Sequence, residues 1–264
     1  RITTHAAGES VAVIAVFNQK GGVGKTTTTL NVAAALAKMG KDPIAIDLDP
    51  QAHLTISLGM GGVAGADSVA AFFREEKTLA QLARELPSHL RLIPGHLEIS
   101  KIEALQARSA SAARRLKQGL EEELGKECVP ILIDCCPMLS VMSLNAILAA
   151  DRVLVPVSAD FLSLQSVNKL DLALRALEGP LQRKIEKRIV LTRFDGRRKL
   201  SYDIYDQLQE RYGKDLCATR VVENVALAAS PTQAQDVFAF APSSPGARDY
   251  AKLTLELVES GFFD

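Results

Sequence analysis

One segment limits the folds open to this chain more than any other, a glycine-rich loop between a buried strand and a helix. The apolar, β-branched run at residues 11–17 predicts a strand that is buried on both faces. Residues 20–27 follow with the sequence KGGVGKTT, and the segment from Thr26 to Met39 favours a helix that ends at Gly40. Glycines let backbone N–H groups turn toward an anion, and the start of a helix adds a favourable dipole. This order of elements indicates a phosphate-binding loop.

Strand and helix patterns alternate along the rest of the chain. Further strands are predicted at residues 43–47, 91–94, 129–134, 152–157 and 188–192, and helices at about 100–124, 141–150, 163–178, 200–212 and 247–258. The alternation predicts an α/β fold, with a mainly parallel sheet flanked by helices on both faces. No internal repeat or long linker divides the chain. Residues 1–264 are therefore expected to form a single P-loop domain, with residues 1–10 as a short N-terminal extension.

Composition excludes several classes of protein. The chain has 264 residues, of which 47% are hydrophobic, so it can bury a large core and is neither disordered nor fibrous. No run approaches the roughly 20 apolar residues that span a bilayer. The four cysteines lack the spacing of a zinc site and are typical of a reducing compartment. These features predict a soluble cytoplasmic protein.

The polar residues of the loop supply what a nucleotide needs. Lys25 is expected to reach the β- and γ-phosphates, and the Thr26 hydroxyl to ligate Mg²⁺. The other loop residues would cradle the phosphates through their backbone N–H groups, namely Gly21, Gly22, Val23, Gly24 and Thr27. ATP with Mg²⁺ is therefore the predicted ligand.

Three aspartates follow two of the predicted strands. Asp47 and Asp49 are separated by one residue at the end of the second strand, and burying either without a partner would be costly. Asp134 ends the apolar run that begins at Ile131, and it is expected to hold Mg²⁺ through water. A site with Mg²⁺ and phosphate would give all three carboxylates a role. Alternatively, Asp47 caps the helix that follows it.

These motifs resemble the ParA/MinD family of deviant Walker A P-loop ATPases, and most closely the Soj-like ParA partition ATPases. Lys20 supplies the extra lysine at the start of the loop, and residues 47–51 match the family's D-x-D-P-Q segment. The resemblance implies that Lys20 reaches across an ATP-dependent dimer to the nucleotide of the other subunit. It implies that Asp49 orients the attacking water and that Asp47 supports the water shell of Mg²⁺. It also places Pro231 in the loop that packs on adenine.

One departure from the family affects the segment that senses the γ-phosphate. The family usually has Thr-Pro-Pro after the aspartate, whereas this chain has Cys135, Cys136 and Pro137. The cysteine pair suggests an iron–sulfur site, as in related iron proteins, but a second ligand is missing, because Cys128 would lie at the opposite end of its strand. Small buried thiols are the better interpretation.

A basic stretch suggests a nucleic-acid surface. The net charge is zero, yet residues 183–220 contain eleven Lys or Arg against six Asp or Glu. The resemblance implies non-specific DNA binding just after Asp195, through Arg197, Arg198 and Lys199, with Arg220 as a further candidate. Such phosphate contacts carry no sequence preference and weaken with salt. Glu223 and Ala226 stand where chromosomal relatives often have arginine, which predicts weaker binding or a displaced footprint.

The resemblance implies a ParA-type ATPase that forms an ATP-dependent homodimer, is associated with the nucleoid when ATP-bound, and segregates or positions a cargo. The cargo could be a plasmid, a chromosome or a protein assembly such as a microcompartment or chemoreceptor cluster. A ParB-like protein or cargo adaptor would stimulate a weak intrinsic hydrolysis. The alternative is a MinD-like ATPase that cycles on membranes, but the chain is acidic beyond Lys252, where a basic amphipathic helix would be needed. A ligase that uses ATP to activate a carboxylate is a third class, without identifiable substrate residues.

Overall fold

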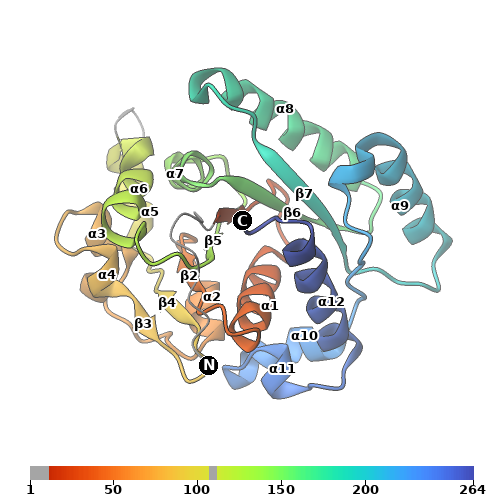
Figure 1. The fold of residues 1–264 in the computed structure, drawn as a ribbon, viewed down its shortest axis with the longest axis horizontal. Helices are drawn as coiled ribbons and strands as arrows, with labels where there is room; N and C mark the ends of the chain where they lie inside the picture. The colour runs from red at the N-terminus through yellow and green to blue at the C-terminus, as the bar shows by residue number, and fades with distance from the viewer. Residues whose placement is uncertain (1–11, 107–111) are drawn as a thin grey trace.

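A seven-stranded sheet runs through the molecule (Figure 1), and the computed structural model describes residues 12–106 and 112–264. The predicted N-terminal extension at residues 1–10 lies outside the described residues. The strands are β1 Val13–Val16, β2 Ile44–Asp47, β3 Arg84–Glu85, β4 Arg91–Ile93, β5 Ile131–Asp134, β6 Arg152–Ser158 and β7 Glu186–Thr192. They lie in the order β3-β4-β2-β5-β1-β6-β7. Only the β3–β4 pair is antiparallel, which confirms the predicted mainly parallel sheet.

Helices cover both faces of this sheet. They are α1 Lys25–Lys38, α2 His53–Ser57, α3 Val69–Phe73, α4 Leu79–Leu82, α5 Ile99–Gln106, α6 Arg115–Gly119, α7 Val141–Ala149, α8 Ser163–Leu181, α9 Lys199–Tyr212, α10 Val225–Ala229, α11 Val237–Phe240 and α12 Pro245–Glu259. The single helix predicted at 100–124 is instead α5, α6 and a π-helical turn, with residues 107–111 outside the described part. The short helices α2, α3, α4, α10 and α11 and the strand β3 were not predicted, because such short elements carry too little periodicity. No described helix has the length and apolar character needed to cross a membrane.

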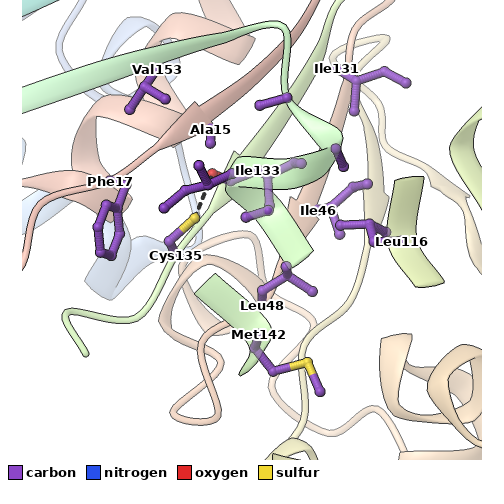
Figure 2. Close-up of a cluster of buried hydrophobic side chains, with 14 of the residues drawn as sticks. Ala15, Phe17, Ile46, Leu48, Leu116, Ile131, Ile133, Cys135, Met142 and Val153 are labelled. Atoms are coloured by element: carbon purple, nitrogen blue, oxygen red, sulfur yellow. Dashed lines mark hydrogen bonds between the residues drawn. The ribbon is translucent and has the colours of Figure 1, made fainter. Parts of the chain in front are cut away.

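Two apolar layers form because side chains alternate across each strand. Ile14 and Val16 of β1 point into the layer that holds α1 and α12, which lie side by side. Ala15 points into the opposite layer, which is covered by α3, α7, α8 and α9. Figure 2 shows part of that second layer, where the Cys135 thiol lies among buried side chains that include Phe17 and Ile133. The continuous apolar runs of the sequence thus reflect strands that are covered on both sides.

The register of the central strands brings the candidate site together. Val16 pairs with Asp134 between β1 and β5, and Asp47 pairs with Asp134 between β2 and β5. β6 lies on the other side of β1 and runs in the same direction. The loops that follow β1, β2, β5 and β6 therefore meet at one edge of the sheet, where ligands of such folds bind.

Candidate functional site

The glycine-rich loop has the backbone conformation that a phosphate cradle requires. Gly22 and Gly24 have φ values of 73° and 85°, in the left-handed region that favours glycine. Gly24 is the N-cap of α1, so the loop leads directly into the start of that helix. A Cβ atom added at Gly21 or Gly22 would meet nothing within 4 Å, so this side of the loop is open. The loop can therefore accept an anion from outside the sheet.

Neighbouring strands hold the loop in place. The Thr192 hydroxyl at the end of β7 donates to the Val23 carbonyl at 2.8 Å. Asn18 donates its side-chain amide to the Pro156 carbonyl of β6 at 2.8 Å and accepts from the backbone N–H of Lys20 at 3.0 Å. The sequence analysis missed Asn18 and Thr192. Both are polar residues at the ends of apolar strands, and this position could have identified them in the sequence.

Lys25 is a largely buried cation whose charge acts on Asp134. Lys25 is only 7% exposed, and its Nζ donates to the backbone carbonyl of Lys20 at 3.1 Å. Burial lowers the pKa of Lys25, while the charge of Asp134 opposes that shift. A lysine held against its own loop in this way is placed to contact a phosphate bound there.

Asp134 and Thr26, each predicted to hold Mg²⁺, are in direct contact. The Thr26 hydroxyl donates to Oδ2 of Asp134 at 2.8 Å, and Thr29 donates to Oδ1 at 3.2 Å. Asp134 is fully buried, and this burial, together with the charge of Asp47, raises its pKa well above the ordinary value. Asp47 and Asp134 are neighbouring buried carboxylates, and a cation stabilises such groups in their charged form. Asp134 and the Thr26 hydroxyl therefore form a site that fits Mg²⁺.

The protein supplies few metal ligands of its own. In the part of the chain that the structure describes, no group of three or more His, Cys, Asp or Glu side chains could hold a metal ion. A hard cation bound to the Thr26 hydroxyl, and held by Asp134 through water, would take its other ligands from phosphate oxygens and water, as Mg²⁺ commonly does. The cation and the nucleotide would therefore bind together.

The two aspartates after β2 have different environments. Asp47 is fully buried and accepts hydrogen bonds from the Thr55 hydroxyl at 2.7 Å and the Thr55 backbone N–H at 2.9 Å. Burial raises the pKa of Asp47 to about 6 against these hydrogen bonds. Asp49 is 9% exposed and accepts from the backbone N–H of Gln51 at 2.9 Å. Asp47 thus fixes α2 to the end of β2, which supports the alternative of a helix-anchoring carboxylate, and its role in the Mg²⁺ water shell stays a prediction.

Lys20 has a partner that the sequence analysis missed. Its Nζ lies 2.5 Å from the Asp160 carboxylate, in the loop that follows β6. Asp160 also accepts from the Ser158 hydroxyl at 2.6 Å and from the backbone N–H of Leu162 at 3.1 Å. Burial acts to raise the pKa of Asp160, but the hydrogen bonds from Lys20 and Ser158 outweigh it and hold the pKa below its ordinary value. Asp160 lies just beyond the strand predicted at 152–157, and this position could have identified it in the sequence.

Pro231 lies in a short 3-10 turn, Ser230–Gln233, and is half-buried. A few residues later the backbone N–H of Val237 donates to Asn31 of α1 at 2.9 Å. This segment therefore lies against the helix that begins at the phosphate loop. The proposed contact of Pro231 with adenine stays a prediction.

The cysteines after β5 are part of the core. Cys135 and Cys136 are 1% and 6% exposed, and burial raises the pKa of both thiols. The Cys135 thiol donates to the Ile133 carbonyl at 3.6 Å (Figure 2). Cys128 is exposed and precedes β5, so it lies at the opposite end of the strand. Protonated, buried thiols agree with a packing role.

The predicted DNA-binding residues gather after β7, and two of them are tied to one carboxylate. Arg197 donates to both oxygens of Asp195, at 2.9 and 3.0 Å, and Arg198 lies 3.2 Å from the same carboxylate. Hydrogen bonds from Arg197 lower the pKa of Asp195 to about 2. Lys199 starts α9 and is exposed. Asp195 therefore orients Arg197 and Arg198 on the surface and, through these ion pairs, neutralises part of their positive charge.

Two further arginines belong to this surface. Arg220 is held between aromatic rings, with its guanidinium 4.8 Å from the Phe194 centroid and 4.7 Å from that of Tyr205. Arg193 forms an ion pair with Glu223 at 3.0 Å and was missed by the sequence analysis. We call these five side chains the basic surface: Arg193, Arg197, Arg198, Lys199 and Arg220.

Comparisons with known proteins identify relatives along nearly the whole chain. A family model described as an AAA domain matches residues 11–187. The chromosome partitioning protein ParA of Caulobacter vibrioides is 32% identical over 250 residues, which cover 93% of each chain. The chromosome-partitioning ATPase Soj of Thermus thermophilus is 34% identical over 246 residues, which cover 93% of this chain and 94% of that protein.

Solved structures share the fold over nearly the whole chain. Cobyrinic acid a,c-diamide synthase from Mycobacterium smegmatis, with bound ATP analogue and magnesium, is 27% identical, with a TM-score of 0.81 and coverage of 95% of this chain and 96% of that chain. The cell division ATPase MinD of Pyrococcus furiosus has a TM-score of 0.75 at 22% identity, covers 94% of this chain and 99% of its own, and shows the fold alone.

Proposed function

Since this chain belongs to the ParA/MinD family of P-loop ATPases, we propose that it positions an intracellular cargo as a ParA-type, DNA-binding ATPase. Its ligands are ATP and Mg²⁺. One observation carries the DNA-binding part of the proposal. Thr192 holds the phosphate loop through Val23, and the basic surface starts at the next residue, Arg193. A nucleotide that shifts the loop would therefore act directly on the segment that contacts DNA.

The chain's own residues provide for phosphoryl transfer. Lys25, held against the loop, would neutralise charge on the transferred phosphoryl group, and Thr26 and Asp134 would hold Mg²⁺. When bound, Mg²⁺ supplies positive charge against the phosphate oxygens. Of the three aspartates that follow β2 and β5, Asp49 is the one that retains some exposure, so we assign it the orientation of the attacking water. Intrinsic hydrolysis would be slow until a partner completes the site.

An ATP-dependent dimer would use the same edge. To reach the nucleotide of a second subunit, Lys20 must leave Asp160 of its own chain. Large apolar side chains stand exposed on the neighbouring loops, with Phe161 80% and Met138 65% exposed. An apolar surface of this kind beside a phosphate loop supports contact with a second copy of the chain.

The cycle then follows from these parts. The ATP-bound dimer would hold the nucleoid through two basic surfaces, and a ParB-like protein or cargo adaptor would stimulate hydrolysis. The resulting monomers would release DNA and rebind elsewhere in the cytoplasm. A gradient of bound dimer would move or space the cargo, whether a plasmid, a chromosome or a protein assembly.

The membrane alternative has weaker support. Phe262 and Phe263, at the end of the chain, are 4% and 3% exposed and pack with α1 and α12. Arg152 of β6 also donates to the Phe262 carbonyl, at 3.3 Å. These two aromatic side chains are therefore part of the core in this structure.

The deciding experiment measures binding to random-sequence DNA at two salt concentrations, with ATP, ADP or no nucleotide. Salt-sensitive binding that requires ATP and is lost in Arg197→Glu is the expected result. Lys252→Glu is the control, because Lys252 is an exposed lysine of α12 outside the basic surface. Absence of DNA binding in every nucleotide state would contradict the proposal. ATP-dependent binding to anionic vesicles would then favour the MinD-like alternative. Amide formation on a carboxylate substrate would favour the third class, a ligase that uses ATP to activate a carboxylate.

A further inference from the structure

Glu223 is an acidic side chain that the backbone places within the basic surface. Phe194 donates its N–H to the Val221 carbonyl at 3.0 Å, and Glu223 donates its own to the Phe194 carbonyl at 3.0 Å. These bonds form a short parallel bridge between the segment after β7 and residues 221–223. Glu223 is thereby fixed beside Arg193, and their contact does not depend on flexible side chains alone.

The contact between Arg193 and Glu223 lies at the exposed part of this surface. Arg193 Nη2 is 3.0 Å from Glu223 Oε1, and the two side chains are 59% and 51% exposed. Arg193 has a φ of 50°, a left-handed conformation that is unfavourable for a residue with a side chain. Strained residues of this kind concentrate at functional sites.

Asp195 and Glu223, the two carboxylates beside the basic surface, differ in their exposure to an approaching phosphate. Asp195 is only 9% exposed and is covered by Arg197 and Arg198. A phosphate that approaches these arginines meets their outer N–H groups before it meets Asp195. Glu223 is half exposed, so a phosphate near Arg193 meets the negative charge directly. Of the two, Glu223 is therefore the one that opposes DNA.

We infer that Glu223 lowers the affinity of the basic surface for DNA, because it occupies Arg193 and repels phosphate. This inference rests on the proposed function. Counterions are released from DNA where a free cation neutralises phosphate, and the exposed Glu223 offsets the charge of Arg193, so Arg193 adds little to salt-dependent binding in the wild type. The surface of a single subunit then binds weakly, and holding DNA requires the two surfaces of a dimer.

The test compares Glu223→Gln, Arg193→Ala and the double variant in ATP-dependent binding to random-sequence DNA over a salt series. We expect Glu223→Gln to bind about three- to tenfold more tightly. Its plot of log affinity against log salt is expected to steepen by about 0.9 for each released arginine, or about 1.8 for a dimer. Arg193→Ala alone is expected to change affinity less than twofold, while in the Glu223→Gln background it removes the gain, which a double-mutant cycle measures.

Glu210→Gln is the matched control. It removes the same charge from an exposed glutamate near the other end of α9, away from the basic surface. Equal gains in Glu223→Gln and Glu210→Gln would overturn the inference in favour of a net-charge effect. A loss of affinity in folded Glu223→Gln would overturn it as well. Wild-type binding without a gain in Glu223→Gln refutes only this inference, whereas no binding by either protein refutes the proposed function too.

Discussion

The nucleotide edge and the basic surface both depend on charge, but they place it in opposite environments. At the nucleotide edge, Lys25, Asp49 and Asp134 are at most 9% exposed. On the basic surface, the side chains of Arg197 and Arg198 are 89% and 71% exposed. Electrostatic interactions are strong where water is excluded and weak where it is not. Single substitutions should therefore have large effects at the first region and small, salt-dependent effects at the second.

The difference also concerns what fixes each side chain. At the nucleotide edge, strand register and buried hydrogen bonds determine the partners, as in the contact of Thr26 with Asp134. On the basic surface, ion pairs such as Arg193 with Glu223 form between half-exposed groups. Exposed pairs contribute about 0.2–1 kcal/mol, so binding partners can break them. The first region is built for a defined chemistry, and the second for adjustable affinity.

The largest effect is expected from Lys25→Met, which removes the buried cation. Loss of a preorganised charge that stabilises a transition state typically lowers kcat by about 100- to 1000-fold. Steady-state hydrolysis with saturating ATP and Mg²⁺ measures this loss. Lys38→Met, at the exposed end of the same helix, is the control and should hydrolyse normally. If Lys25→Met hydrolysed ATP at a rate within tenfold of the wild type, substitutions at the nucleotide edge would lack the large effects that are expected to distinguish it from the basic surface.

The next effect is expected from Asp49→Asn, which keeps the shape of the side chain and removes its charge. We expect ATP-dependent dimerisation to persist and partner-stimulated hydrolysis to fall by about 100-fold, the lower range for a positioned acid or base. Sedimentation with ATP and phosphate release measure the two properties separately. Normal turnover would exclude Asp49 from the reaction and direct attention to another residue of this edge.

A third prediction tests the pair that joins the nucleotide edge to a second subunit. Lys20→Ala should bind nucleotide but lose ATP-dependent dimerisation, because the bridging cation is gone. Asp160→Asn should have the opposite effect, since it frees Lys20 from its own chain, and we expect dimers at roughly tenfold lower ATP concentration. Light scattering during an ATP titration measures both. Equal dimerisation of Lys20→Ala and the wild type would show that Lys20 has no role between subunits.

Most of the fold and of the nucleotide edge could be predicted from the sequence, because burial leaves a clear pattern. Apolar runs marked the strands β1, β2, β4, β5, β6 and β7, and the polar residues at the ends of several of them marked the site. Asp160 and Thr192 were missed, although they obey the same rule, because single polar residues after a strand are too common to stand out without the sheet order. The short helices between β2 and β4 were missed because they depend on tertiary packing.

The basic surface was harder to predict, since charge counts do not reveal pairing. The sequence shows that Arg197, Arg198 and Lys199 are consecutive, and their role in DNA binding stays a prediction. It could not show that Asp195 engages two of them or that aromatic rings hold Arg220. Those contacts depend on a turn and on a bridge between Phe194 and Val222, which are 28 residues apart, and no local pattern encodes such a bridge.

The smallest effect is expected from Lys199→Gln, which isolates one unpaired charge. Within residues 12–106 and 112–264, Lys199 makes no ion pair, unlike Arg193, Arg197 and Arg198. A free lysine that contacts phosphate should release its full share of counterions, so the salt dependence of DNA binding should lose a slope of about 0.9 per subunit. Affinity at moderate salt should fall only about two- to fivefold, and hydrolysis without DNA should not change. Lys252→Gln on α12 is the control. If Lys199→Gln instead altered hydrolysis, the two regions would be coupled through the start of α9, and Thr192 would be the next residue to substitute, because it contacts the phosphate loop directly.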